Sequence, residues 1–278
     1  MRTHGFVVLR DRLRQGLRAA TGRRRAYEAF RLPESARRRG ARDGLAVVAI
    51  VKDEASYLEE WIEFHAMLGA RAFFFYDNGS TDGTAALLDA PGWVAEVRRI
   101  DWRAFDGLNA TQVFAYSHAL ANYGPDFRWM AFIDVDEFLF PLEGDDLPAT
   151  LMRFAGQPSV SLPWFNFGPD GHVARPEGLV IESYRERGVF PPRADQASLL
   201  RFKTIVDPAE ITHGGSHSFG YRGHGLVLFN EAGEAVEPGL ARRPGFARSE
   251  VLRLNHYFTR SEEELAAKLA KGRVSANG

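Results

Sequence analysis

Four stretches of the chain have the length and residue pattern of β-strands, and three of them are largely apolar. The first covers residues 45–51, Leu-Ala-Val-Val-Ala-Ile-Val, and is followed by the charged segment 52–54. The others cover 71–76, 94–100 and the long run 129–140. Runs that are apolar at odd and even positions alike are typical of strands with both faces covered. The pattern predicts a mostly parallel sheet flanked by helices.

Helical spacing appears between these runs. Ser56 and Glu59 have the spacing of a capping box, and apolar residues then recur every three or four positions as far as Leu68, before Gly69. A second helix is predicted over residues 109–122. Alternating strands and helices indicate βαβ units with right-handed crossovers, and therefore an α/β fold.

The second half of the chain is less regular. A short helix is predicted at 147–155 and an aromatic strand at 159–167, after which residues 168–258 are rich in Gly, Pro and His. We expect this part to form an antiparallel, loop-rich extension on the acceptor side of a site. Its strand-like pieces are 179–184, 199–206, 226–229 and 251–254. Ser261 and Glu264 have capping-box spacing and predict a last helix that ends near Gly272.

Acidic residues follow the predicted strands. Asp134, Asp136 and Glu137 interrupt the run 129–140, and Asp53 and Asp77 follow two earlier strands. Ligands bind at the carboxyl ends of the strands in open α/β sheets, so these acids are expected at one rim. In an extended strand Asp134 and Asp136 would face one side, which sends Glu137 to the other face in an orienting or structural role. Paired carboxylates favour Mg²⁺ or Mn²⁺.

Composition narrows the class of protein. The chain has 278 residues, is 45% hydrophobic and has no cysteine, so disulfides, thiolate metal sites and a cysteine nucleophile are excluded. No run reaches the length of a membrane span, and the cytoplasm is the default location. Phosphate-loop, dinucleotide-loop and nucleophile-elbow motifs are missing, which weakens kinase, dehydrogenase and esterase interpretations.

Charge is concentrated at the N-terminus. Residues 1–44 hold 13 Arg and 4 acids, a balance of +9, which leaves −10 for the rest of a chain whose net charge is −1. This Arg-rich arm predicts either a solvated, partly helical segment or peripheral contact with anionic lipid at the inner membrane face. No nucleic-acid-binding module is visible, so nucleic acid is not expected as a partner.

Several motifs in order make the sequence resemble the clan of glycosyltransferase families 2 and 92, and the family 92-like branch most closely. They are Val48-Ala-Ile-Val-Lys-Asp-Glu54, Glu59-Glu-Trp-Ile-Glu-Phe-His65, Tyr76-Asp-Asn-Gly-Ser-Thr-Asp-Gly83, Phe132-Ile-Asp-Val-Asp-Glu-Phe138, Trp164-Phe-Asn-Phe-Gly168 and Asn255-His-Tyr-Phe-Thr-Arg-Ser261. The resemblance covers residues 45–272. It divides the chain into the arm (1–44), a glycosyltransferase domain (45–272) and a tail (273–278), and it implies a GT-A fold.

The resemblance also implies roles by position. Asp136 would bind the metal ion, with His256 as a late metal or phosphate ligand, and Asp134 would approach the ribose or sugar. The nucleotide pocket would be lined by Lys52, Asp53, Glu54, Asp77 and Asn78. Asp53 departs from the family pattern, in which many relatives have Asn at this position.

Further candidates come from the chemistry of sugar transfer. A departing diphosphate gains negative charge, so cations such as Lys203 would stabilise it; the alternative is a solvent-facing lysine on a strand. The acceptor hydroxyl needs a base, for which Asp170 is the first candidate and a plain turn residue the alternative. Trp164 and Phe165 are candidate platforms for a sugar ring, or core residues. His213, His217 and His224 match no zinc pattern.

The sequence thus predicts a metal-dependent, inverting glycosyltransferase that uses Mn²⁺ or Mg²⁺ and moves a sugar from a UDP-sugar to a saccharide or glycolipid acceptor. Inversion rests on the resemblance alone. One alternative is a nucleotidyltransferase, which also places acids beside a nucleotide. The other is a non-catalytic module that binds a nucleotide or glycan and docks through its basic arm.

Overall fold

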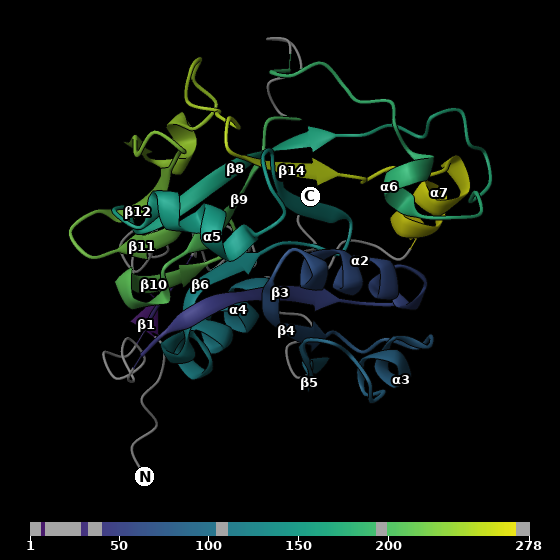
Figure 1. Ribbon diagram of the computed structural model, residues 1–278, viewed down its shortest axis with the longest axis horizontal. Coiled ribbons are helices and arrows are strands. Elements are labelled where there is room, and N and C mark those ends of the chain that lie inside the picture. The colour runs from purple at the N-terminus through teal and green to yellow at the C-terminus, as the bar shows by residue number, and fades with distance from the viewer. Residues whose placement is uncertain (1–6, 9–28, 33–40, 104–110, 193–198, 271–278) are drawn as a thin grey trace, which may run out of the picture.

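The structure is a computed structural model that describes residues 7–8, 29–32, 41–103, 111–192 and 199–270. Its centre is an eight-stranded mixed sheet in the order β5-β4-β3-β6-β9-β8-β14-β7 (Figure 1). The strands are β3 (Asp43–Val51), β4 (Ala70–Asp77), β5 (Glu96–Asp101), β6 (Phe127–Phe132), β7 (Glu137–Pro141), β8 (Ser159–Asn166), β9 (Phe202–Val206) and β14 (Leu252–His256). Four of the seven pairs of neighbouring strands are parallel, including the three pairs that join β5, β4, β3 and β6. The predicted GT-A-like fold is confirmed.

Both faces of this sheet are covered. Leu45, Val47 and Ala49 of β3 point into one apolar cluster with α2 (Ala55–Met67) and α5 (Leu147–Leu151). Ala46 and Val48, the alternate residues, point into a second cluster with α4 (Thr111–Asn122). Because successive side chains of a strand point to opposite faces, a continuous apolar run is what a doubly covered strand requires.

A second sheet has the order β1-β2-β10-β11-β12-β13. Its strands are Val7–Val8, Ala29–Arg31, β10 (Ile211–Gly215), β11 (Phe219–Tyr221), β12 (Gly225–Phe229) and β13 (Ala235–Val236), all antiparallel to their neighbours. The expected antiparallel extension is therefore present. Phe30 of β2 is buried against Phe114 of α4, so part of the Arg-rich arm joins the folded unit. Residues 1–6, 9–28 and 33–40 of the arm, like the tail, lie outside the described residues.

Three short helices complete the described fold. They are α3 (Thr84–Leu88), α6 (Val180–Ser183) and α7 (Glu262–Ala270). In Figure 1 α7 (yellow) lies beside α6, away from β10, β11 and β12. The residues of α6 were predicted as a strand, and that prediction is wrong. Among the described residues, no helix has both the length and the apolarity to cross a membrane.

The predicted long strand 129–140 is also corrected. It is two strands, β6 and β7, separated by a turn at residues 133–136 that Glu137 N closes by donating to Asp134 O at 2.9 Å. β6 lies in the middle of the sheet beside β3, while β7 lies at its edge beside β14. The turn thus carries the acidic residues across the carboxyl rim of the sheet.

Candidate active site

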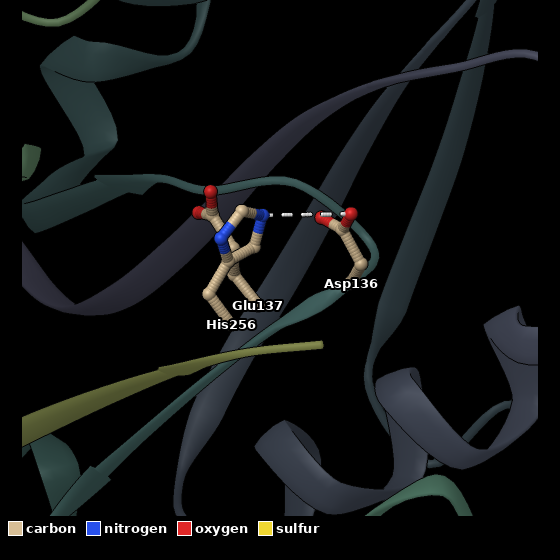
Figure 2. A group of neighbouring side chains, drawn as sticks. All are labelled: Asp136, Glu137 and His256. Atoms are coloured by element: carbon tan, nitrogen blue, oxygen red, sulfur yellow. Dashed lines mark ion pairs between the residues drawn. The ribbon is translucent and has the colours of Figure 1, made fainter. Parts of the chain in front are cut away.

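Asp136, Glu137 and His256 come together at the carboxyl rim. One ligand atom from each lies within 4.8 Å of the others, and all three side chains are buried. Strand pairing accounts for this because β14 runs antiparallel to β7, with His256 directly opposite Glu137. Asp136 Oδ2 is 3.6 Å from His256 Nε2, and Figure 2 shows the two facing each other with the Glu137 carboxylate close to the same ring. We call these three residues the acid–histidine cluster.

The position of Glu137 corrects the prediction from strand alternation. Alternation requires an extended backbone, but residues 133–136 form a turn, so it does not hold across them. Glu137 is fully buried, and its Oε2 accepts a hydrogen bond from Asp134 N at 3.0 Å. Its other oxygen, Oε1, has no hydrogen-bond partner within the described part of the chain. Glu137 is therefore a candidate ligand and not merely an orienting residue.

The donor set fits a divalent cation. Two carboxylates and one imidazole are ligands that Mn²⁺ accepts, and carboxylates also suit Mg²⁺. The amide oxygen of Asn166 lies 2.9 Å from His256 Nδ1, so that nitrogen donates its proton and Nε2 faces the cluster. Burial, together with the charges of Asp134 and Asp136, raises the pKa of Glu137 well above its usual range. A cation at the cluster would offset that unfavourable negative charge.

Lys203 supplies a positive charge beside the cluster. Its ammonium lies 2.7 Å from Asp134 Oδ2 and 3.5 Å from Glu137 Oε1, and its side chain is only 1% exposed. The alternative of a solvent-facing lysine on a strand is therefore wrong. Burial by itself lowers the pKa of Lys203, but the charges of Asp134 and Glu137 outweigh burial and raise it. The ammonium is thus charged at neutral pH.

A second cation, Lys268 of α7, contacts Asp136 Oδ2 directly. Burial would raise the pKa of Asp136, yet Lys268 and His256 hold it well below its usual range. The C-terminal segment reaches the rim at another point as well, where Arg260 Nη1 lies 3.8 Å from Glu54 Oε2. The described site is therefore closed on one side by residues that follow β14.

The predicted nucleotide-pocket residues lie at the ends of β3 and β4. Asp77 Oδ1 accepts from Ser80 N at 2.8 Å, and Asp77 Oδ2 lies 3.5 Å from Arg99. Asp53 has a positive φ of 54° and accepts from Thr81 N at 2.6 Å, so its carboxylate braces the loop after β4. Asn78 leaves its buried Oδ1 without a hydrogen-bond partner among the described residues.

Lys52, also predicted for this pocket, is half-buried and directly follows β3. Val51, the last residue of β3, pairs with Asp77 at the end of β4. The parallel register therefore brings both strand ends, and the residues that follow them, to one edge of the sheet.

Trp164 and Phe165 point to opposite sides of β8. The ring of Trp164 contacts that of His256 in a tilted arrangement with centroids 4.1 Å apart, so Trp164 borders the acid–histidine cluster. Phe165 is buried instead against Phe190, at 4.1 Å, and under the guanidinium of Arg253. Because neighbouring side chains of a strand alternate, a single platform cannot use both rings.

Asp170 lies in a turn and has a positive φ of 52°. Its Oδ2 accepts from Arg185 N at 3.1 Å, and its side chain is partly exposed. No contact joins it to the acid–histidine cluster within the described residues.

Sequence reasoning gave too little weight to Glu137 and His217 and did not single out Asn166 or Lys268. His217 lies near Lys203 and Asp134, and burial together with the charge of Lys203 lowers its pKa to about 4. His213 and His224 contact other partners, Thr212 and Phe229. Asn166 could have been found within the Trp164–Gly168 motif, but no local pattern marks Lys268.

Comparison with known proteins identifies the family to which the chain is similar. The family model of glycosyltransferase family 92 matches residues 46–230. A family 92 protein of Oryza sativa subsp. japonica is 28% identical over 168 residues, covering 59% of this chain and 27% of that protein. A family 92 protein of Arabidopsis thaliana is 28% identical over 204 residues, covering 68% of this chain and 33% of that protein. The chain thus spans about a third or less of the length of these relatives.

A solved structure, UDP-glucose pyrophosphorylase complexed with UDP-glucose, is 10% identical with a TM-score of 0.34 and covers 59% of this chain and 76% of its own. That likeness is too weak to support an argument. The sheet, with acids and a candidate cation cluster at its carboxyl rim, defines a GT-A-like α/β protein. Since the family match covers well over half of the sequence, the chain belongs to glycosyltransferase family 92. The predicted likeness to family 2 stays a prediction.

Proposed function

We propose that the protein is a metal-dependent glycosyltransferase that transfers a sugar, with inversion, from a UDP-sugar to a saccharide or glycolipid acceptor. The observation that carries this proposal is the acid–histidine cluster at the sheet rim of a family 92 chain. Asp136, Glu137 and His256 would hold Mn²⁺ or Mg²⁺. The bound ion would supply electrostatic stabilisation of the diphosphate that leaves the sugar.

Other residues at the same rim are already in position to contact the donor. Lys203 fixes the Asp134 carboxylate, which stays 35% exposed and can accept hydrogen bonds from the ribose or sugar hydroxyls. Asn78 offers a buried amide oxygen to a nucleotide donor group. Trp164 packs against the imidazole of His256 and helps to hold it in place. These groups are fixed before substrate arrives, so little reorganisation is needed during the reaction.

Asp170 is kept as the proposed acceptor base. In a single displacement the acceptor hydroxyl oxygen bonds to the anomeric carbon, the bond to UDP breaks, and the hydroxyl proton passes to a carboxylate. Asp170→Asn should lower kcat about 10²-fold or more while leaving Mn²⁺ affinity unchanged. Loss of folded protein at unchanged kcat would instead assign Asp170 to its turn alone.

The test of the proposal is a panel of nucleotide-sugars assayed for released nucleoside diphosphate, with Mn²⁺ and with a chelator. UDP release from one UDP-sugar that depends on the metal and rises with acceptor is the expected result. Pyrophosphate release from a nucleoside triphosphate would indicate a nucleotidyltransferase. Nucleotide binding without turnover of any donor would indicate a non-catalytic module.

We also propose that the Arg-rich arm gives the protein peripheral contact with anionic membranes at the cytoplasmic face. Co-sedimentation with anionic liposomes should fall when Arg23, Arg24, Arg25, Arg37, Arg38 and Arg39 are all replaced by Gln in the full-length chain. This design keeps β2, which a truncation at residue 44 would remove. Binding that is insensitive to these substitutions and to added salt would contradict electrostatic docking.

A further inference from the structure

The acid–histidine cluster already faces a cation that belongs to the chain itself. Lys268 of α7 contacts Asp136 Oδ2, and its ammonium also lies 3.4 Å from the Phe258 carbonyl and 4.1 Å from the centre of the Phe258 ring. The Asp136 side chain is 9% exposed and that of Lys268 is 35% exposed. The pair is therefore partly shielded from water, where a charge contact is stronger than at an open surface.

The contacted oxygen is the one that a metal ion would need. Asp136 Oδ2 is also the atom that lies 3.6 Å from His256 Nε2, so it points into the cluster. An ammonium group and a divalent cation at that oxygen would repel each other. A buried carboxylate is costly without a counter-charge, so Lys268 can leave Asp136 only if another cation replaces it.

The attachment of α7 allows such a replacement. The first turn is held by Glu264, whose carboxylate accepts from Tyr57 OH at 2.5 Å, Tyr184 OH at 2.6 Å and Ser261 Oγ at 2.6 Å. None of the described α7 residues is buried. Beyond Glu264, Lys268 connects the last turn of α7 to the site through its contacts with Asp136 and Phe258. A helix held by polar contacts at its two ends can release one end and keep the other.

We propose that Lys268 is the internal counter-cation of the Asp136 site. Its ammonium and a divalent cation compete for Asp136 Oδ2, and binding of the divalent cation releases the last turn of α7. Lys268 is thus a positioning residue that sets the cation affinity of the site and couples it to the C-terminal helix. The inference rests on the proposed metal-dependent function.

The first test is Mn²⁺ affinity without any donor, measured by calorimetry or by the spectrum of free Mn²⁺. Lys268→Gln should bind Mn²⁺ about tenfold more tightly than the wild type, a change equivalent to about 1.4 kcal/mol. The matched control is Arg98→Gln, which removes an equal charge from an exposed ion pair with Glu96 on the far strand β5. It should leave Mn²⁺ affinity within twofold of the wild type.

The second test follows α7 directly. Because the chain has no cysteine, Glu59→Cys on α2 and Ala267→Cys on α7, both at exposed positions, give one defined pair of nitroxide labels. Saturating Mg²⁺, which is diamagnetic, should broaden and lengthen the distance distribution between the labels. Lys268→Gln should give the broad distribution without Mg²⁺.

The outcomes separate the two proposals. Equal Mn²⁺ affinity in the wild type and Lys268→Gln, or a label distance unmoved by Mg²⁺ while Mn²⁺ binds, overturns the role of Lys268 and leaves the proposed function standing. Absence of Mn²⁺ binding in both proteins at millimolar concentration overturns the metal site and the role of Lys268 together. Tighter binding and a released helix support both.

Discussion

At the scale of single residues, buried charge explains most of the site. Lys203 and Glu137 are only 1% and 0% exposed, yet neither charge is isolated. The Lys203 ammonium lies beside the carboxylates of both Asp134 and Glu137, so the three groups form a line of alternating charges. Asp136 is paired separately, with Lys268. Each buried charge is stabilised by its neighbour. Removal of one member of a pair should therefore lower the free energy of unfolding by more than the intact pair contributes to it.

Lys203→Met tests how much the buried charge of Lys203 contributes to the stability of the protein. The substitution keeps the volume of the side chain but leaves two acids without their counter-charge, and it should lower the free energy of unfolding by about 3–5 kcal/mol. The double variant Lys203→Met, Glu137→Gln should recover part of that loss. Urea unfolding measures both values, and a loss below about 1 kcal/mol for the single variant would show that Lys203 is not the central counter-charge.

A second prediction for a single residue concerns His65 and the pH dependence of the stability of the protein. Its Nδ1 donates to Trp61 O and its Nε2 accepts from Leu139 N, so the neutral ring ties α2 to β7. Burial lowers the pKa of His65 from 6.5 to about 4. Between these two pH values the His65 imidazole is protonated in the unfolded chain but not in the folded chain. Its contribution to the free energy of unfolding is therefore fully present above pH 6.5 and falls as the pH drops towards 4.

The loss attributable to His65 over this window should reach about 3 kcal/mol. Urea unfolding at pH 7 and pH 4.5 measures it, with His65→Gln as the control that retains an acceptor for Leu139 N but does not titrate. The wild type should lose more stability than the variant between the two pH values. An identical pH dependence in both proteins would contradict a buried neutral imidazole.

At the scale of elements, the sequence predicted strands better than it predicted their ends. Residues 45–51 are apolar on both faces and form a strand covered on both faces, as expected. Ile133 and Val135 are as apolar as the strand before them, and their alternation with Asp134 and Asp136 fits an extended strand as well as a turn. The choice is made by long-range pairing of β7 with β14, which hydrophobic periodicity does not contain.

Two capping boxes with the same spacing had different outcomes. Ser261 and Glu264 form theirs, with Ser261 N donating to Glu264 Oε2 at 3.0 Å. The predicted box at Ser56 is wrong because α2 begins at Ala55, with Glu54 as its N-cap. Glu54 N donates instead to Thr84 Oγ1 at the start of α3, and Ala55 N donates to Asp82 Oδ2 in the loop after β4. Tertiary contacts replaced the local motif, and only the fold reveals them.

Ser261→Ala tests the element that the formed box supports. Loss of the cap should weaken α7 by about 1 kcal/mol and speed amide exchange in residues 262–270. Exchange in β6 should not change, because the central sheet does not depend on α7. Hydrogen exchange by mass spectrometry gives both readings, and equal acceleration in β6 and α7 would show that α7 does not open independently.

At the scale of the whole molecule, the candidate site draws on residues from Lys52 to Lys268, so it exists only when the full sheet has formed. The sequence placed Asp53, Asp77 and Asp136 at one rim because parallel strands end together. It named Lys203 as a candidate cation but not its place beside Asp134 and Glu137, which Lys203 reaches from the antiparallel strand β9. It did not name Lys268, which lies on the helix after the last strand. The matched segments make up only 27% and 33% of two of these relatives, so the activity of this chain has to be measured on the chain itself.

The most direct measurement is UDP release from the preferred UDP-sugar and acceptor by three purified proteins: wild type, Asp136→Asn and Arg98→Gln. Mn²⁺-dependent turnover that a chelator abolishes is expected in the wild type and in Arg98→Gln. Asp136→Asn should lose at least about 10²-fold in kcat while it stays folded by circular dichroism. Turnover by Asp136→Asn at the wild-type rate, or wild-type turnover that persists in chelator, would contradict the central claim that Asp136 binds the catalytic cation.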